Sequence, residues 1–263
     1  MDLKISSKFE KKDLGNVEIV YTIPADLIAK TKSEVLEELS KDVTLPGFRK
    51  GMAPASKVES SLSTDTVNEH ILSHLLPKAF ADSVKEYKFN PAIYPKFEAI
   101  KIGQGSDWEI RALTCELPKV TLGDYKKKLK GKTEDELIKE LTEVVKLEIP
   151  QMLIDEEVNE RLSQLLSRIE KLGLQLEGYL KSVGKTVETL REEYQKQSKD
   201  AISLELILNE IANEEKIEVD DKELGEFVKT TGSDIKTLTD EQMRMIRRVV
   251  MRRKALEKLA KRV

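Results

Sequence analysis

The hydrophobic periodicity of this chain changes near residue 118, and that change limits the folds that it can adopt. Before this point, apolar residues recur at every second position in two stretches, from Val17 to Ile23 and from Trp108 to Ala112. Such alternation is typical of strands with one buried face. After residue 118, apolar residues recur at spacings of three and four, as in helices that pack through one face. The sequence therefore predicts an α+β domain followed by an all-α domain, in a chain that is mostly helical.

Two helical patterns lie between the predicted strands and flank a loop. The first follows Pro24 and places four apolar residues on one face: Ile28, Val35, Leu36 and Leu39. The second, longer pattern runs from Val58 to Leu76, and Pro77 is expected to kink or restart it. This order places the loop between two long helices, from which its residues can reach a partner.

The loop itself reads Leu45-Pro46-Gly47-Phe48-Arg49-Lys50-Gly51-Met52-Ala53-Pro54. Two prolines and two glycines bracket an aromatic residue and two adjacent cations, which predicts a turn rather than a helix interior. One interpretation is a docking tip, with an apolar anchor beside a charge pair, for an RNA-rich surface or an acidic groove. The other is an ordinary surface turn with Phe48 folded back into the core, which is the commoner case. Spacing alone leaves both open.

The helical half begins after a segment with a different composition. Residues 118–133 are rich in lysine, contain glycine and show little apolar periodicity, so they are predicted to connect a domain at 1–117 with a domain at 134–263. Near the end of the chain, Asp220-x-x-Glu223 and Thr239-x-x-Gln242 resemble capping boxes and predict the starts of two helices.

Composition restricts the class of protein. Charged residues make up 35% of the chain and aromatic residues 5%, with a net charge of −3. No apolar run reaches membrane-spanning length, the first residues lack the apolar core of a signal peptide, and a single cysteine forms no internal disulfide. These features predict a cytoplasmic protein without a membrane partner.

Charge is distributed unevenly near the end of the chain. From Met243 to Val263 there are nine Lys and Arg residues against one acid, Glu257, while the segment from Glu210 to Glu226 is acidic. We expect the basic segment to be solvated or paired within the chain. Contact with RNA is the alternative.

Signals for catalysis or metal binding are weak. His70 and His74 lie four residues apart on a predicted helix, but no third ligand or zinc-protease glutamate accompanies them. Cys115 falls in an alternating strand, where a lone cysteine is usually a small core residue. We therefore predict no catalytic residue, no metal and no cofactor.

The string Gly47-Phe48-Arg49-Lys50-Gly51-x-x-Pro54 closely resembles the signature loop of trigger factor, the bacterial chaperone of the ribosomal exit tunnel. The stretches Ile149–Glu157, Gly178–Thr186 and Ile211–Val219 are similar to its C-terminal domain. The resemblance implies that the loop contacts an exit-tunnel ribosomal protein and nearby ribosomal RNA. It also implies an ATP-independent chaperone that shields nascent or unfolded polypeptides. The ribosome-binding residues implied are Gly47, Phe48, Arg49, Lys50, Gly51 and Pro54.

The chain departs from the typical trigger factor in one respect. Members of that family usually carry a prolyl isomerase domain between these two parts, but here only Pro118 to Pro150 separates them. A folded domain needs roughly 50 residues or more. We therefore predict that the isomerase domain is absent and that the chain is not an enzyme, with residual prolyl isomerisation as an alternative.

Client binding by the helical domain requires apolar surface that stays available to unfolded chains. Four methionines with adaptable side chains, together with Ile154, are candidates for this surface: Met152, Met243, Met245 and Met251. Alternatively, these side chains pack within an ordinary helical core. A helical holdase or assembly adaptor that never meets the ribosome also stays open, as does a weak homodimer.

Overall fold

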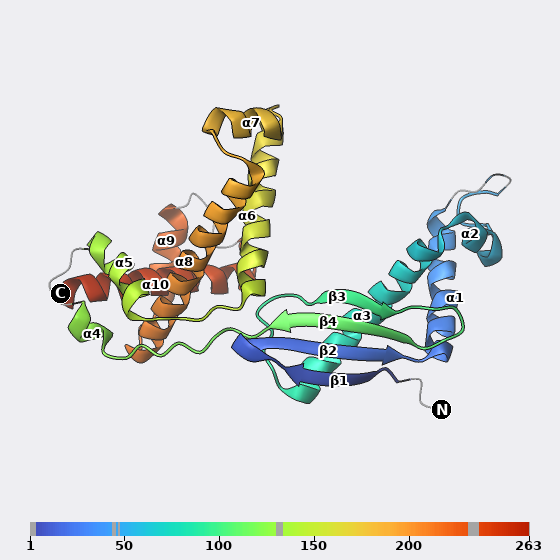
Figure 1. Ribbon diagram of the computed structural model, residues 1–263, viewed down its shortest axis with the longest axis horizontal. Coiled ribbons are helices and arrows are strands. Elements are labelled where there is room, and N and C mark those ends of the chain that lie inside the picture. Colours follow the sequence, from blue (N-terminus) through green and yellow to red (C-terminus); the bar gives the residue numbers. More distant parts are fainter. Residues whose placement is uncertain (1–3, 44–45, 47, 130–133, 231–236, 263) are drawn as a thin grey trace. The chain divides into compact units, whose positions relative to one another are not determined.

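The computed structural model describes residues 4–43, 46, 48–129, 134–230 and 237–262. Its contacts divide the chain into two compact units, Met1–Leu117 (unit 1) and Pro118–Val263 (unit 2) (Figure 1). Unit 1 combines an antiparallel sheet with helices, and the described part of unit 2 is built from helices. The predicted fold class, α+β followed by all-α, is confirmed.

Unit 1 is built on a four-stranded antiparallel sheet with the strand order β1-β2-β4-β3. The strands are β1 (Ser6–Lys11), β2 (Asn16–Ile23), β3 (Lys96–Lys101) and β4 (Trp108–Cys115). The two predicted strands form the central pair, with Asn16 opposite Cys115 and Ile23 opposite Trp108. The sequence analysis missed β1 and β3. Both are edge strands with mostly exposed side chains, so they lack the alternation that reveals a half-buried strand.

The helix α3 (Thr64–Tyr87) runs along one face of this sheet (Figure 1). The helix α1 (Ala25–Asp42) packs against α3, and the short helix α2 (Ala55–Ser61) packs against α1. A short 3-10 turn, η1 (Asp13–Gly15), joins β1 to β2. Side chains of β2 and β4, such as Ile19 and Ile110, share one core with Val35 of α1 and Ile71 of α3. This core holds α1 and α3 against the sheet.

The long helix predicted from Val58 to Leu76 is in fact two helices. Ser63 separates them, because its hydroxyl accepts a hydrogen bond from the backbone N–H of Thr66 at 3.1 Å and caps α3. The predicted restart at Pro77 is also wrong, since α3 continues through Pro77 to Tyr87. The loop therefore lies between α1 and the short helix α2.

Unit 2 contains seven described helices. They are α4 (Tyr125–Lys128), α5 (Glu134–Val144), α6 (Gln151–Lys171), α7 (Leu176–Val183), α8 (Val187–Glu214), α9 (Asp221–Thr230) and α10 (Asp240–Arg262). Both predicted capping boxes are confirmed. Asp220 Oδ1 accepts from Glu223 N at 2.7 Å, and Asp220 N donates to Glu223 Oε2 at 3.1 Å. Thr239 and Gln242 make the same reciprocal pair at the start of α10.

The segment 118–133, predicted to be a connector, packs into unit 2 in its described part. Leu122, Tyr125 and Leu129 are buried there in a core that includes side chains of α5, α8 and α10. In addition, Lys126 Nζ lies 2.7 Å from carboxylate oxygens of Glu214 and Glu215. The spacing of the three buried residues, three and then four, is helical, but the lysines between them obscure it in the sequence.

Most of the described cations of α10 are paired within unit 2. Lys254 Nζ lies 2.7 Å from Glu223 Oε1, Arg247 Nη2 lies 2.7 Å from Asp221 Oδ1, and Lys258 contacts Glu215 at 2.8 Å. The hydrogen bond from Lys254 is the main cause that lowers the pKa of the Glu223 carboxyl. The basic segment is thus largely paired within the chain, which is the role expected for it.

Candidate functional site

The loop between α1 and α2 closes on a tight turn. Met52 N donates a hydrogen bond to Arg49 O at 2.9 Å, and Gly51 has a φ of +80°, as the third residue of a type II turn requires. A Cβ atom at Gly51 would lie 3.1 Å from the backbone oxygen of Lys41. Glycine is therefore favoured here on two counts, the left-handed backbone and the close approach to the end of α1.

The residues after the turn fix the loop to the helices. Ala53 is buried and Val58 is fully buried, so the chain turns inward directly after Met52. Pro54 precedes α2, and its carbonyl oxygen accepts the N–H groups of Lys57 and Val58 at 2.8 and 3.2 Å. Between α1 and α2, Lys32 Nζ lies 2.5 Å from Glu59 Oε1. The turn is thus held at the end of a braced helical pair.

The side chains of the predicted docking residues lie on the surface. Phe48 is 38% exposed, so the interpretation in which it folds back into the core is wrong. Arg49, Lys50 and Pro54 are exposed as well, whereas Gly47 lies outside the described residues. The sequence analysis overlooked Met52, whose side chain is 71% exposed. The loop therefore combines two apolar side chains and two cations at one ordered turn.

One of the predicted client-binding residues is a core residue, Met245 is exposed, and the other methionines among them are partly buried. Ile154 is buried with Ile149 and Val158, because this side of α6 packs against α8. Met243 and Met251 are partly buried against Val219, Leu224 and Val250, where α10 packs on α9. Met152 is half-buried. The alternative of an ordinary helical core therefore describes Ile154, whereas client binding by the four methionines stays a prediction.

Exposed apolar residues of unit 2 gather instead where α6, α7 and α8 meet. In Figure 1, α7 lies at the ends of α6 and α8. We call this end the helical tip and define it by five exposed residues: Leu166 (41%), Leu172 (73%), Leu174 (52%), Val183 (41%) and Val187 (50%). Three of the five, Leu172, Leu174 and Val183, are directly next to Gly173 or Gly184. Leucine and valine beside helix-ending glycines are the sequence signal that could have found this site.

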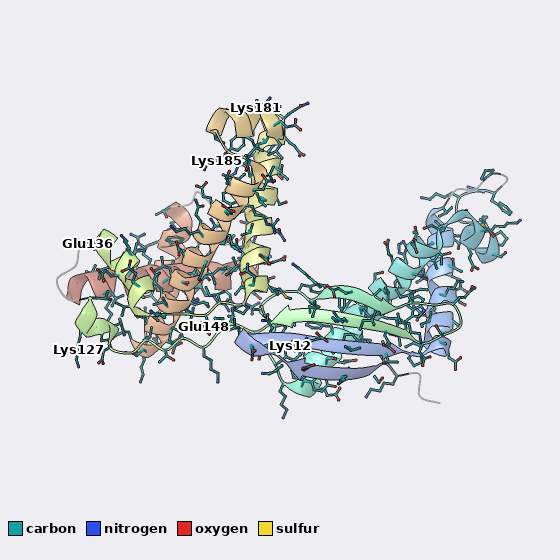
Figure 2. The ribbon with its side chains drawn as sticks, in the orientation of Figure 1. Lys12, Lys127, Glu136, Glu148, Lys181 and Lys185 are labelled. Carbon is teal, nitrogen blue, oxygen red and sulfur yellow. The ribbon has the colours of Figure 1, made fainter. Side chains whose placement is uncertain are left out.

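The backbone of the helical tip is ordered by two similar helix ends. At the end of α6, Leu174 N donates to Ile169 O at 3.1 Å and Gly173 has a φ of +68°, which is a Schellman motif. At the end of α7, Lys185 N donates to Leu180 O at 3.0 Å around Gly184. Figure 2 shows Lys181 and Lys185 at this end, and Lys185 pairs with Glu193 of α8. Hydrogen bonds therefore fix the backbone at the ends of α6 and α7, where exposed apolar side chains of the helical tip are located.

The histidines and the cysteine considered for catalysis have contacts or burial that suit a structural role. His74 Nε2 is 3.2 Å from Glu38 Oε2 on the neighbouring helix, and His70 is half-buried. Burial raises the pKa of the Cys115 thiol to about 11, so the reactive thiolate is disfavoured at neutral pH. Over the described ranges, no group of three or more His, Cys, Asp or Glu side chains could hold a metal ion. Among the same residues, no helix has the length and apolar character to cross a membrane.

The Gly51 geometry leads to a stability prediction for unit 1. We expect Gly51→Ala to lower the free energy of unfolding of unit 1 by about 1–2 kcal/mol through the left-handed backbone alone, and further through the Lys41 contact. Gly105→Ala is the matched control, since Gly105 has a φ of +70° with no atom within 4 Å of the added Cβ. Urea unfolding followed by the fluorescence of Trp108, the single tryptophan, which is buried in β4, measures unit 1. If both variants lose the same free energy of unfolding, the contact between the added Cβ at position 51 and the Lys41 backbone oxygen contributes nothing to the loss.

Two family profiles match the chain. The profile of the "Bacterial trigger factor protein (TF)" matches residues 5–143, and that of the "Bacterial trigger factor protein (TF) C-terminus" matches residues 110–261. The two matches overlap, so the N-terminal and C-terminal parts of the family follow each other directly in this chain.

Similar proteins include trigger factors of two bacteria. The trigger factor of Streptococcus mutans serotype c is 33% identical over 122 residues, which are 46% of this chain and 29% of that protein. The trigger factor of Staphylococcus epidermidis is 26% identical over 183 residues, which are 70% of this chain and 38% of that protein. The chain thus spans only about a third of the length of these relatives.

A solved structure has the same fold over nearly the whole chain. It comes from work on promiscuous substrate recognition in the folding and assembly activities of the trigger factor chaperone. It superposes with a TM-score of 0.68 at 16% sequence identity, covering 97% of this chain and 99% of that one. The profiles span both units, and this likeness shows that the fold is shared as well. The chain therefore belongs to the trigger factor family.

Proposed function

We propose that this protein is an ATP-independent chaperone of the cytoplasm, which docks at the ribosomal exit tunnel through the α1–α2 loop. In this proposal the helical tip shields nascent or unfolded polypeptides. The observation that supports docking most directly is the ordered turn from Arg49 to Met52, which carries the family's signature residues on its surface. Family membership supports the chaperone role.

The docking loop offers two kinds of interaction. Phe48 supplies apolar surface that an apolar pocket can bury. Arg49 can form paired hydrogen bonds with a carboxylate or phosphate through its planar guanidinium, and Lys50 adds a compact charge beside it. Because the ribosome is rich in RNA, we expect the ionic part of the affinity to fall as the salt concentration rises.

The helical tip suits the binding of unfolded chains. Unfolded polypeptides expose apolar segments, and burying these against apolar side chains is favourable without any nucleotide. The five apolar residues of the helical tip are exposed, and Lys171, Lys181 and Lys185 lie in the same helices and the turns between them. Such charges keep an exposed apolar patch soluble. We infer that this tip, and not the buried stripes of α6 and α10, is the client surface.

We also infer that the protein does not catalyse prolyl isomerisation. The two family matches overlap over residues 110–143, and the described part of residues 118–133, the first segment of unit 2, packs into the core of that unit. This arrangement leaves no room for a separate domain between them. A proline-limited refolding assay tests the inference, and a rate enhancement by the purified chain would contradict it.

The proposed function is tested with the intact chain in two assays. We expect it to pellet with bacterial ribosomes at physiological salt, and to slow the aggregation of a chemically denatured protein when no ATP is present. Aggregation that proceeds unchanged would contradict the chaperone role. Suppression of aggregation without ribosome binding would favour the second candidate, a ribosome-independent holdase, which the exposed tip alone supports.

A further inference from the structure

Met52 lies in the docking loop but is not one of the signature residues, and its side chain is exposed. Its side chain is 71% exposed, nearly as much as that of Leu172, which at 73% is the most exposed large apolar side chain among the described residues. A single exposed apolar side chain is common and needs no explanation. Met52, however, lies in one turn with two cations, and a second exposed apolar residue, Phe48, directly precedes that turn.

The turn fixes where Met52 lies relative to these residues. The hydrogen bond from Met52 N to Arg49 O closes the turn, which brings the Cα atoms of Arg49 and Met52 within about 7 Å of each other. Phe48 directly precedes Arg49, and Met52 follows Gly51. Phe48 and Met52 therefore lie on either side of Arg49 and Lys50, and the turn keeps these residues closer together than an extended chain would.

The backbone also keeps the Met52 side chain outside the core. The next residue, Ala53, is buried, and Val58 behind it is fully buried, so the inward position is already occupied. Gly51 lies close to the end of α1, since a Cβ atom at this position would be 3.1 Å from the backbone oxygen of Lys41. The packing of Ala53 and Gly51 thus leaves the Met52 side chain exposed to water. Exposure of this apolar surface is unfavourable, and contact with an apolar partner would remove that cost.

Resting on the proposed docking function, we propose that Met52 is a second apolar anchor of the loop and that it binds an apolar pocket on a ribosomal protein. The flexible, polarisable thioether adapts well to irregular apolar pockets in proteins. RNA is bound mainly through phosphate contacts and through stacking of bases on aromatic or guanidinium planes, and methionine provides neither. Arg49 and Lys50 serve the charged part of the contact.

Three variants test this role in a ribosome-binding titration of the full chain labelled at its N-terminus. Met52→Gln keeps the length of the side chain but removes its apolar character, and we expect about tenfold weaker binding. Met52→Leu restores the apolar character, and we expect affinity within about twofold of the original. Met245→Gln is the matched control, because Met245 is 62% exposed on α10 of unit 2, and we expect no change. Trp108 fluorescence checks that unit 1 stays folded in each variant.

Titration at several salt concentrations identifies the kind of partner. Loss of an apolar contact leaves the slope of log affinity against log salt unchanged, whereas loss of a phosphate contact makes the slope shallower. A shallower slope for Met52→Gln would overturn the assignment to a protein pocket and favour RNA. Unchanged affinity of Met52→Gln would overturn the inference but leave docking intact, provided that joint replacement of Phe48, Arg49 and Lys50 still removes binding. If that joint replacement also binds normally, the docking proposal itself is wrong.

Discussion

Joint replacement of Phe48, Arg49 and Lys50 by alanine is expected to abolish co-sedimentation with ribosomes at physiological salt. Burial of a phenylalanine contributes about 1.5–3 kcal/mol, and a charge-assisted hydrogen bond contributes about 1.5–3 kcal/mol. Loss of even about 4 kcal/mol lowers the affinity roughly a thousandfold. Because Gly51 and Pro54 are retained, the turn and the start of α2 should stay intact.

The matched control lies on α10. Met245, Arg244 and Arg248 are exposed and provide the same chemistry, one apolar side chain and two cations. Their joint replacement by alanine should leave ribosome binding unchanged. Undiminished pelleting of the loop variant would rule out docking through this turn. Loss of binding in the α10 variant would instead support the alternative in which the basic segment contacts RNA.

The second large effect is expected at the helical tip. Replacing Leu172 and Leu174 by glutamine, and Val183 and Val187 by threonine, removes most of its apolar surface with little change in volume. If a client buries a good part of these four side chains, at about 25 cal/mol per Å² of apolar surface, its affinity should fall at least tenfold. We therefore expect about ten times more protein to be needed for the same suppression of aggregation, measured by light scattering with a denatured protein.

A pair of exposed apolar residues on α10 provides the control for the tip. Met245→Gln combined with Val249→Thr changes exposed side chains of 62% and 42% on the same unit. We expect this pair to suppress aggregation like the original chain, and we expect both variants to bind ribosomes normally. Equal loss of activity in the two variants would mean that clients bind the apolar surface of unit 2 without preference for the tip.

Strands and helix starts could be predicted where the segment itself contains apolar alternation or a capping box. Alternation in β2 and β4 and the capping boxes at Asp220 and Thr239 are local signals, and each gave the correct element. The edge strands β1 and β3 are held by hydrogen bonds to a neighbouring strand, and such pairing leaves no periodicity in the sequence. The break at Ser63 was missed, because the apolar spacing continues across it and predicts one helix.

The candidate site was predictable in position but not in detail. The glycines and prolines around Phe48 identify a loop, whereas the exposure of Met52 depends on how Ala53 and Gly51 pack. Likewise, Ile154 and Met243 lie on apolar helix faces, and their burial follows from which helices pack against those faces. Periodicity shows that a face is apolar, but it does not show whether another helix covers it.

The main core of unit 2 is formed by residues that lie far apart in the sequence. This spacing affects the order in which the two units can fold during synthesis. The core of unit 2 joins Leu122 and Leu137 to Ile207 and, near the end of the described chain, Leu259. Unit 1, by contrast, has all the strands of its sheet once Cys115 has left the ribosome, when β4 can pair with β2. Domains generally fold as units during synthesis, the N-terminal one first. We therefore expect the α1–α2 loop to acquire its structure while much of the helical unit is still being translated.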